Sequence, residues 1–129
     1  MQAAASLVAI VDDEESVRRA LARLVRSAGF DVQTFASGAD FLHSLARSVP
    51  HCVVLDLRMP HMSGFETQDA MIEAQCFVPV VIITGDDSPE ARQQTLGRGA
   101  KAYLRKPVDE MMLLDAIHSA IQSAAPASR

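Results

Sequence analysis

The 129-residue sequence contains few cysteines and fewer positive than negative charges, and each shortage excludes a class of protein. Two cysteines, Cys52 and Cys76, cannot form a disulfide framework, so we interpret them as free thiols in a reducing cytosol. Lys and Arg number 12 against 16 Asp and Glu, a formal net charge of −4. Because the sequence shows no basic cluster, its composition argues against direct nucleic-acid binding.

Long hydrophobic runs are also absent. No apolar run approaches the length of a membrane span, and residues 1–6 lack the regions typical of a signal peptide. These observations predict a cytoplasmic protein without a membrane partner. The length suits one domain with its own core, which we expect over residues 1–123, followed by an Ala/Pro/Ser-rich tail or truncated linker over residues 124–129.

Short apolar runs are what the sequence does contain. Three of them, at residues 7–11, 52–56 and 79–84, are too short for helices and are flanked by turn-forming residues, so we predict strands buried on both faces. Residues 31–35 and 102–105 are more polar and suit the two edges of a sheet.

In the segments that follow the predicted strands, apolar residues recur at helical spacing. The predicted helices cover about residues 15–28, 37–46, 63–75, 88–98 and 109–121. Arginines of the first helix are interpreted as a solvated face. Ser63 and Glu66 have capping-box spacing, and we expect Phe65 and Ile72 to face inward from the third helix. The fourth helix offers little apolar surface and is expected to be loosely held.

Five strands alternating with five helices predict an α/β fold with a doubly wound, five-stranded parallel sheet and helices on both faces. With the polar strands at the edges, the simplest strand order is 2-1-3-4-5, as in flavodoxin-like folds. This order places the topological switch point between the first and third strands. Asp12, Asp13 and Asp56 all follow or end those two strands, so we expect them to converge in one crevice.

Three converging carboxylates repel one another unless they share protons or hold a hard cation, and oxygen ligands without a nearby histidine favour Mg²⁺. The last strand delivers Lys106 to the same sheet edge, and Thr84 ends the fourth strand there. A carboxylate, a magnesium ion and a lysine together predict a phosphoryl-transfer site in which Asp56 is the nucleophile.

Several motifs resemble one known family over about residues 7–121. They are Val11-Asp12-Asp13, Leu55-Asp56-Leu57-Arg58-Met59-Pro60 with Ser63-Gly64, Ile83-Thr84-Gly85, and Gly99-Ala100 leading to Lys106-Pro107. Together they resemble the receiver domain of two-component response regulators. The sequence from Arg58 to Glu66 and the Thr84-Gly85 pair are most similar to those of FixJ-type regulators of the LuxR output class.

The resemblance implies a role for each acidic residue of the crevice. Asp56 is the expected phosphoacceptor, Asp13 a direct Mg²⁺ ligand and Asp12 a ligand through water. The main-chain carbonyl of Arg58 would complete the protein's share of the metal site.

The same resemblance implies a switch. Thr84 would close on the phosphoryl oxygen, Lys106 would pair with the phosphoryl group, and Tyr103 would turn inward as Thr84 moves. This movement would alter the surface formed by the fourth helix, the fifth strand and the fifth helix. The family also implies a cis peptide bond between Lys106 and Pro107. Arg58 and Asp86, each two residues beyond a site residue, are hypothesised to tune the lifetime of the phosphoryl group.

The implied partners are a sensor histidine kinase as phosphodonor and either a downstream protein target or a covalently linked output domain. Phosphorylation-dependent homodimerisation is a further use of the switch surface that the family suggests. On this interpretation the chain is a signalling domain and not an enzyme, because it catalyses only its own phosphorylation and dephosphorylation.

Two alternatives remain open at this point. A phosphatase of the haloacid-dehalogenase type also uses an aspartate nucleophile and Mg²⁺, but it needs a second acid two residues further on, where this sequence has Arg58. A pure interaction module with a receiver fold would need no phosphorylation at all. The combination of Asp12, Asp13, Asp56, Thr84 and Lys106 argues against that interpretation.

Overall fold

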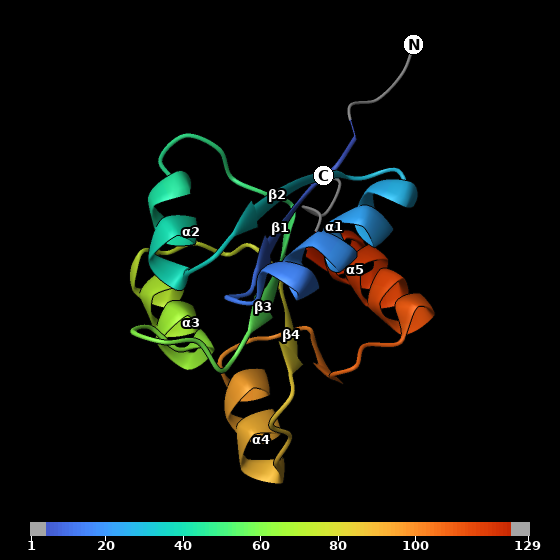
Figure 1. The fold of residues 1–129 in the computed structure, drawn as a ribbon. Helices are drawn as coiled ribbons and strands as arrows, with labels where there is room; N and C mark the ends of the chain where they lie inside the picture. The colour runs from blue at the N-terminus through green and yellow to red at the C-terminus, as the bar shows by residue number, and fades with distance from the viewer. Residues whose placement is uncertain (1–4, 125–129) are drawn as a thin grey trace.

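Five strands form one parallel sheet in the computed structural model, which describes residues 5–124. The strand order is β2-β1-β3-β4-β5, as predicted (Figure 1). The strands are β1 (Leu7–Val11), β2 (Asp31–Phe35), β3 (Cys52–Asp56), β4 (Val80–Thr84) and β5 (Ala102–Arg105). All four neighbouring pairs are parallel, so the carboxyl ends of the strands meet at one edge of the sheet.

Helices cover both faces of the sheet (Figure 1). The helices are α1 (Glu15–Ser27), α2 (Gly38–Ser44), α3 (Gly64–Glu73), α4 (Pro89–Gly97) and α5 (Glu110–Ala124). Buried side chains of α1 and α5 pack on one face, in a cluster that includes Val25 and Ile117. Those of α2, α3 and α4 pack on the other face, in a cluster that includes Phe41 and Met71. Two hydrophobic layers therefore enclose the sheet.

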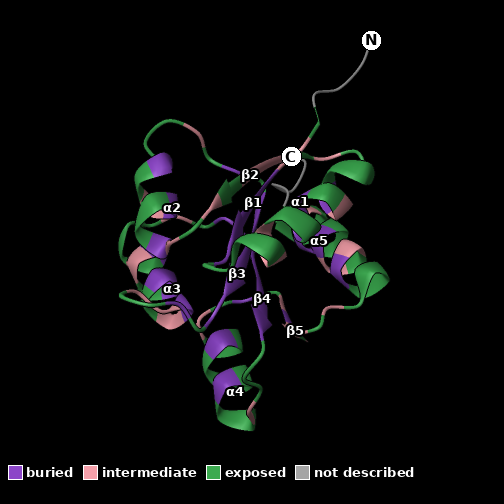
Figure 2. Ribbon diagram, viewed as in Figure 1, coloured by how far each residue is buried: buried purple, intermediate pink, exposed green. Residues whose placement is uncertain are grey.

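The central strands are buried along their whole length (Figure 2). Every residue of β3 and β4 is buried, whereas β2 is exposed or partly exposed throughout. This difference follows from the sequence, because apolar side chains alone can fill both faces of a central strand. A rigid central strand thus presents Asp56 at its carboxyl end.

The prediction that Ile72 faces inward from α3 is wrong. Ile72 is 51% exposed, while its neighbour Met71 is 2% exposed and packs against the sheet. The capping box of Ser63 and Glu66 is present as predicted and fixes where the helix begins. From that start, helical rotation brings Met71 to the sheet and leaves Ile72 in solvent.

Few side chains hold α4 to the rest of the domain. Ala91 and Thr95 are its buried residues, whereas Leu96 is 39% exposed. Gln68 of α3 donates a hydrogen bond from Nε2 to the carbonyl of Thr95 at 3.2 Å. Arg98, directly after α4, pairs with Asp69 of α3 at 2.7 Å. The looseness expected of this helix stays a prediction.

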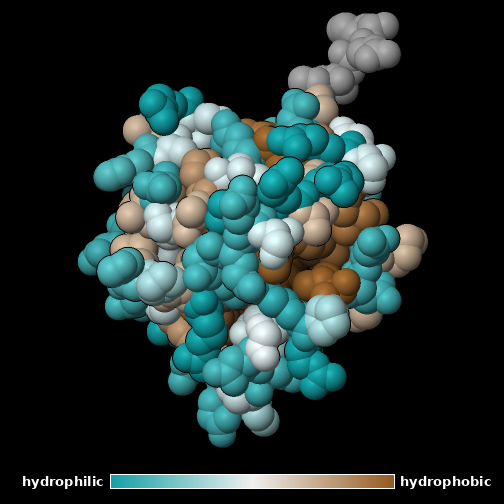
Figure 3. Space-filling model, in the orientation of Figure 1, coloured by the Kyte–Doolittle hydropathy of each residue, from teal (hydrophilic) through white to brown (hydrophobic). Residues whose placement is uncertain are grey.

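The surface is mainly hydrophilic, with an apolar groove between α1 and the start of α5 (Figure 3). Val17, Ala20 and Leu24 of α1 line the groove opposite Pro107 and Val108. None of the helices within residues 5–124 has both the length and the apolar character needed to span a bilayer. Helix α5 reaches Ala124, and residues 125–129 of the predicted tail lie outside the described residues, so the division of the chain stays a prediction.

Candidate functional site

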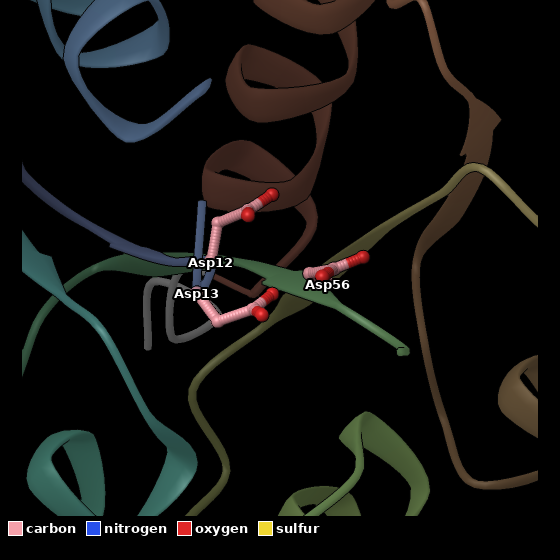
Figure 4. A group of neighbouring side chains, drawn as sticks. All are labelled: Asp12, Asp13 and Asp56. Atoms are coloured by element: carbon pink, nitrogen blue, oxygen red, sulfur yellow. The ribbon is translucent and has the colours of Figure 1, made fainter. Parts of the chain in front are cut away.

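Three aspartates converge where β1 and β3 end (Figure 4). Asp12 and Asp13 directly follow β1, and Asp56 is the last residue of β3, the neighbouring strand. One carboxylate oxygen from each lies within 4.8 Å of the others. Asp12 and Asp56 are buried, whereas Asp13 is exposed. The predicted convergence of these three residues is confirmed, and the cluster opens to solvent on the side of Asp13.

Hydrogen bonds from the start of α1 hold Asp12 in place. Its Oδ1 accepts a hydrogen bond from the Glu14 backbone N–H at 2.9 Å. Its main-chain carbonyl accepts one from Nη1 of Arg18 at 2.8 Å. The interpretation of all α1 arginines as a solvated face is therefore wrong for Arg18, which folds back from the first turn of α1. Sequence spacing gives no signal for this contact, because it depends on the angle at which α1 leaves the sheet.

Lys106 supplies the positive charge of the site. Its backbone N–H donates to the carbonyl of Thr84 at 2.8 Å, which fixes it beside the end of β4. Its Nζ lies 2.8 Å from Asp12 Oδ2 and 3.4 Å from Asp56 Oδ1. Nζ is also 3.9 Å from Glu14 Oε1, a neighbour that the sequence did not indicate. The Lys106–Pro107 peptide bond is cis, as the family resemblance implied.

The electrostatics of the cluster raise the proton affinity of two groups. Burial, and next the negative charge of Asp12, raise the pKa of Asp56 to about 6, against the opposing effect of Lys106. Burial alone would lower the pKa of Lys106, but its ion pairs with Asp12 and Asp56 raise it above the ordinary value. Lys106 thus stays charged at neutral pH, and Asp56 is mainly ionised.

Thr84 ends β4 beside Lys106, and Tyr103 lies on β5. Thr84 is fully buried, and its Oγ1 accepts a hydrogen bond from the Asp86 backbone N–H at 3.1 Å. Tyr103 is 8% exposed, and the guanidinium of Arg92 lies 5.5 Å from its ring centroid. Burial, and next the nearby carboxylate of Asp87, raise the pKa of the Tyr103 hydroxyl. The inward turn expected of Tyr103 stays a prediction.

The arrangement is chemically suited to a dianionic group and a hard cation. Three carboxylates supply only oxygen ligands, the preference of Mg²⁺ and Ca²⁺. One ammonium beside them can neutralise an incoming anion. The carbonyl of Arg58 follows Asp56 by two residues, and its part in metal binding stays a prediction.

Comparisons with known proteins agree with this geometry. The model of the response regulator receiver domain family matches residues 8–118. Response regulator protein TodT of Pseudomonas putida is 38% identical over 120 residues, 93% of this chain and 53% of TodT. Transcriptional regulatory protein FixJ of Bradyrhizobium diazoefficiens is 35% identical over 120 residues, 93% of this chain and 58% of FixJ. The structure of chemotaxis protein CheY4 of Vibrio cholerae superposes with a TM-score of 0.84 and 31% identity, covering 91% of this chain and 99% of CheY4.

The chain spans about half the length of the curated relatives it matches. All of the site residues described above lie inside the matched residues 8–118. The FixJ likeness inferred from the motifs is confirmed by a relative of that name. On the match of the family model and the shared fold, the chain belongs to the response regulator receiver domains of two-component systems.

Proposed function

We propose that the domain accepts a phosphoryl group on Asp56 and thereby switches a protein-interaction surface. The observation that carries this proposal is the position of Lys106, whose Nζ lies between the carboxylates of Asp12 and Asp56. An ammonium held there offsets the charge of the ionised carboxylates and is placed to pair with an anion that arrives at Asp56.

In the proposed reaction, a carboxylate oxygen of Asp56 attacks the phosphorus of a phosphohistidine. The new P–O bond forms as the P–N bond breaks, and the imidazole nitrogen keeps the electron pair and takes up a proton. Lys106 neutralises charge on the transferred group, and the hydroxyl of Thr84 donates to one of its oxygens after the β4 loop moves.

We propose Mg²⁺ as the cation, held by Asp13 and Asp56 directly, by Asp12 through water and by the carbonyl of Arg58. When bound, the metal would supply positive charge to the phosphoryl oxygens during transfer. The all-oxygen composition of the cluster supports this choice.

The proposed phosphodonor is a sensor histidine kinase. The apolar groove between α1 and α5 borders Lys106, so a helix docked there would lie next to the site. On the output side, Leu96, Met111 and Met112 expose apolar surface on α4 and α5. This face is the proposed contact for an output domain, a separate target or a second copy of the chain.

The first test is the intact mass of the chain after incubation with a small acyl phosphate. We expect a single phosphoryl adduct in the presence of Mg²⁺ and none in EDTA, with fragment masses that place the adduct on Asp56. Adduct formation that is independent of the metal, or located on another residue, would contradict the proposed site.

An ion pair at the mouth of the site provides a second test. Arg58 Nη2 and Asp86 Oδ2 are 3.0 Å apart and join the loops that follow β3 and β4. Both side chains are more than half exposed, and an exposed pair of this kind contributes about 0.2–1 kcal/mol. We expect Arg58→Ala to speed loss of the phosphoryl group by up to about fivefold, because water reaches it more easily. Decay of the adduct mass with time measures the rate.

Arg19→Ala is the matched control, because it removes an arginine from another exposed pair, with Glu15, on α1. The control variant should lose its phosphoryl group at the wild-type rate. An unchanged rate in Arg58→Ala would show that the pair does not shield the phosphoryl group.

A further inference from the structure

The outer edge of β2 is open. β2 ends the sheet, with β1 as its neighbour among the described strands (Figure 1). Backbone hydrogen bonds of Asp31 and Phe35 run toward β1. In a parallel ladder, alternate residues point their N–H and C=O groups to opposite sides. Val32 and Thr34 therefore direct their four backbone groups away from the sheet, where another strand can pair with them.

Arginines surround this open edge. Two hollows flank β2, one against α1 and one against α2, and Thr34 lines both of them. The arginines that line the two hollows are Arg18, Arg19, Arg23, Arg26 and Arg47, five of the 12 basic residues in the sequence. Glu15 is the acidic residue among the lining side chains. Arg18, Arg19, Arg23 and Arg26 lie on α1, and Arg47 lies in the turn after α2. Their position beside the open edge of β2 is a consequence of the fold.

The strand does not block its own edge. Sheet edges are commonly protected by proline or lysine on the edge strand itself. β2 has neither, and its single charged residue is Asp31, at its start. The positive charges sit on α1 and in the turn after α2, where they leave the backbone accessible.

We propose that the β2 edge is a docking site for an extended acidic segment of a partner protein. The segment adds to the sheet as a sixth strand through the backbone groups of Val32 and Thr34, and its carboxylates meet the flanking arginines. Backbone pairing of this kind requires a peptide, so a protein segment fits the edge better than a nucleic acid does. Asp56 is not part of this site, although Arg18 at its border also donates to the carbonyl of Asp12.

The test uses a fluorescein-labelled decapeptide of alternating Val and Glu, measured by fluorescence anisotropy. We expect saturable binding, no binding of a Val/Lys peptide, and slower amide hydrogen exchange at Val32 and Thr34 in the complex. A labelled polyglutamate chain and a labelled oligodeoxythymidine report on charge attraction without strand pairing. Equal affinity for either of these probes would overturn the proposal.

Variants separate the two parts of the proposed site. The double substitution Arg23→Glu and Arg26→Glu should weaken binding of the Val/Glu peptide by at least about tenfold, because negative charges on the protein and the peptide would then face each other. Thr34→Pro removes an outward N–H without touching the ladder to β1 and should abolish binding. Lys101→Glu with Arg105→Glu makes the same charge change at the β5 edge and should leave binding unchanged.

Phosphoryl adduct formation should stay at the wild-type level in all three variants, which shows that each is folded. Unchanged affinity in the Arg23/Arg26 double variant would overturn the proposal. So would wild-type affinity in a folded Thr34→Pro variant. If Thr34→Pro does not fold, the double variant and the exchange of the Thr34 amide decide the question.

Discussion

Asp56→Asn is expected to abolish the phosphoryl adduct and, at neutral pH without divalent cations, to stabilise the fold. The first effect follows because an amide lacks the carboxylate oxygen that attacks phosphorus. The second follows because burial and the charge of Asp12 disfavour the ionised form of Asp56 in the folded state. This one substitution therefore removes the proposed phosphoacceptor and also the free-energy cost of its buried charge.

The size and sign of the stability effect follow from the pKa of Asp56. Folding raises this pKa from 3.8 to about 6. Above about pH 6 the carboxyl of Asp56 is ionised in both the folded and the unfolded state, so the folded state carries the full free-energy cost of the buried charge. Each unit corresponds to about 1.4 kcal/mol, and the raised pKa already includes the opposing effect of Lys106, so we expect a gain of up to about 3 kcal/mol. As the pH falls from 6 through 3.8, the folded carboxyl takes up its proton first and the gain disappears.

Urea denaturation in EDTA measures this effect at neutral pH and again below pH 3.8. Asp69→Asn is the matched control, because it makes the same chemical change at an exposed carboxylate that pairs with Arg98. The control should form the adduct and show no gain in stability. An Asp56→Asn variant that is no more stable than the wild type at neutral pH would contradict the buried-charge interpretation. An adduct on that variant would contradict the assignment of the phosphoacceptor.

The sequence predicted the strands and the chemistry of the site because both depend on local patterns. Apolar runs that end in Asp56 and Thr84 can be read without a structure, and the parallel order follows from alternation of strands and helices. The predicted capping box of Ser63 and Glu66 was also confirmed. The helix starts predicted near residues 37, 88 and 109 likewise have a side chain that accepts a hydrogen bond from the first turn, at Ser37, Ser88 and Asp109.

Features that depend on the angle between packed elements could not be predicted in this way. Arg18 reaches the carbonyl of Asp12 because of how α1 lies on the sheet, and Ile72 faces solvent because of a rotation of α3 by one residue. Four of the five arginines around β2 lie close together in the sequence of α1, but their position beside the open edge of β2 exists only in the folded chain. Local patterns thus specify which groups carry the chemistry, while packing decides which additional residues position them.

Gly64 shows how strongly packing constrains the site. It is the first residue of α3, and its N–H donates to the carbonyl of Leu57 at 2.9 Å. A Cβ at this position would lie 2.6 Å from the carbonyl oxygen of Asp56 and 2.8 Å from Cα of Leu57. Both atoms belong to the backbone and cannot rotate away. We expect Gly64→Ala to force α3 away from the end of β3 and to reduce the free energy of unfolding by about 3 kcal/mol.

Gly97→Ala is the matched control at the end of α4. A Cβ at Gly97 meets nothing within 4 Å, so the gain in helix propensity should stabilise the fold by about 0.5 kcal/mol. Urea denaturation compares the two variants, and the adduct mass reports on the site. Because the displaced atoms include the backbone of Asp56 itself, Gly64→Ala should also slow adduct formation in the molecules that remain folded. A Gly64→Ala variant as stable and as readily phosphorylated as Gly97→Ala would mean that α3 can recede without moving Asp56, and that close packing of this turn does not position the phosphoacceptor.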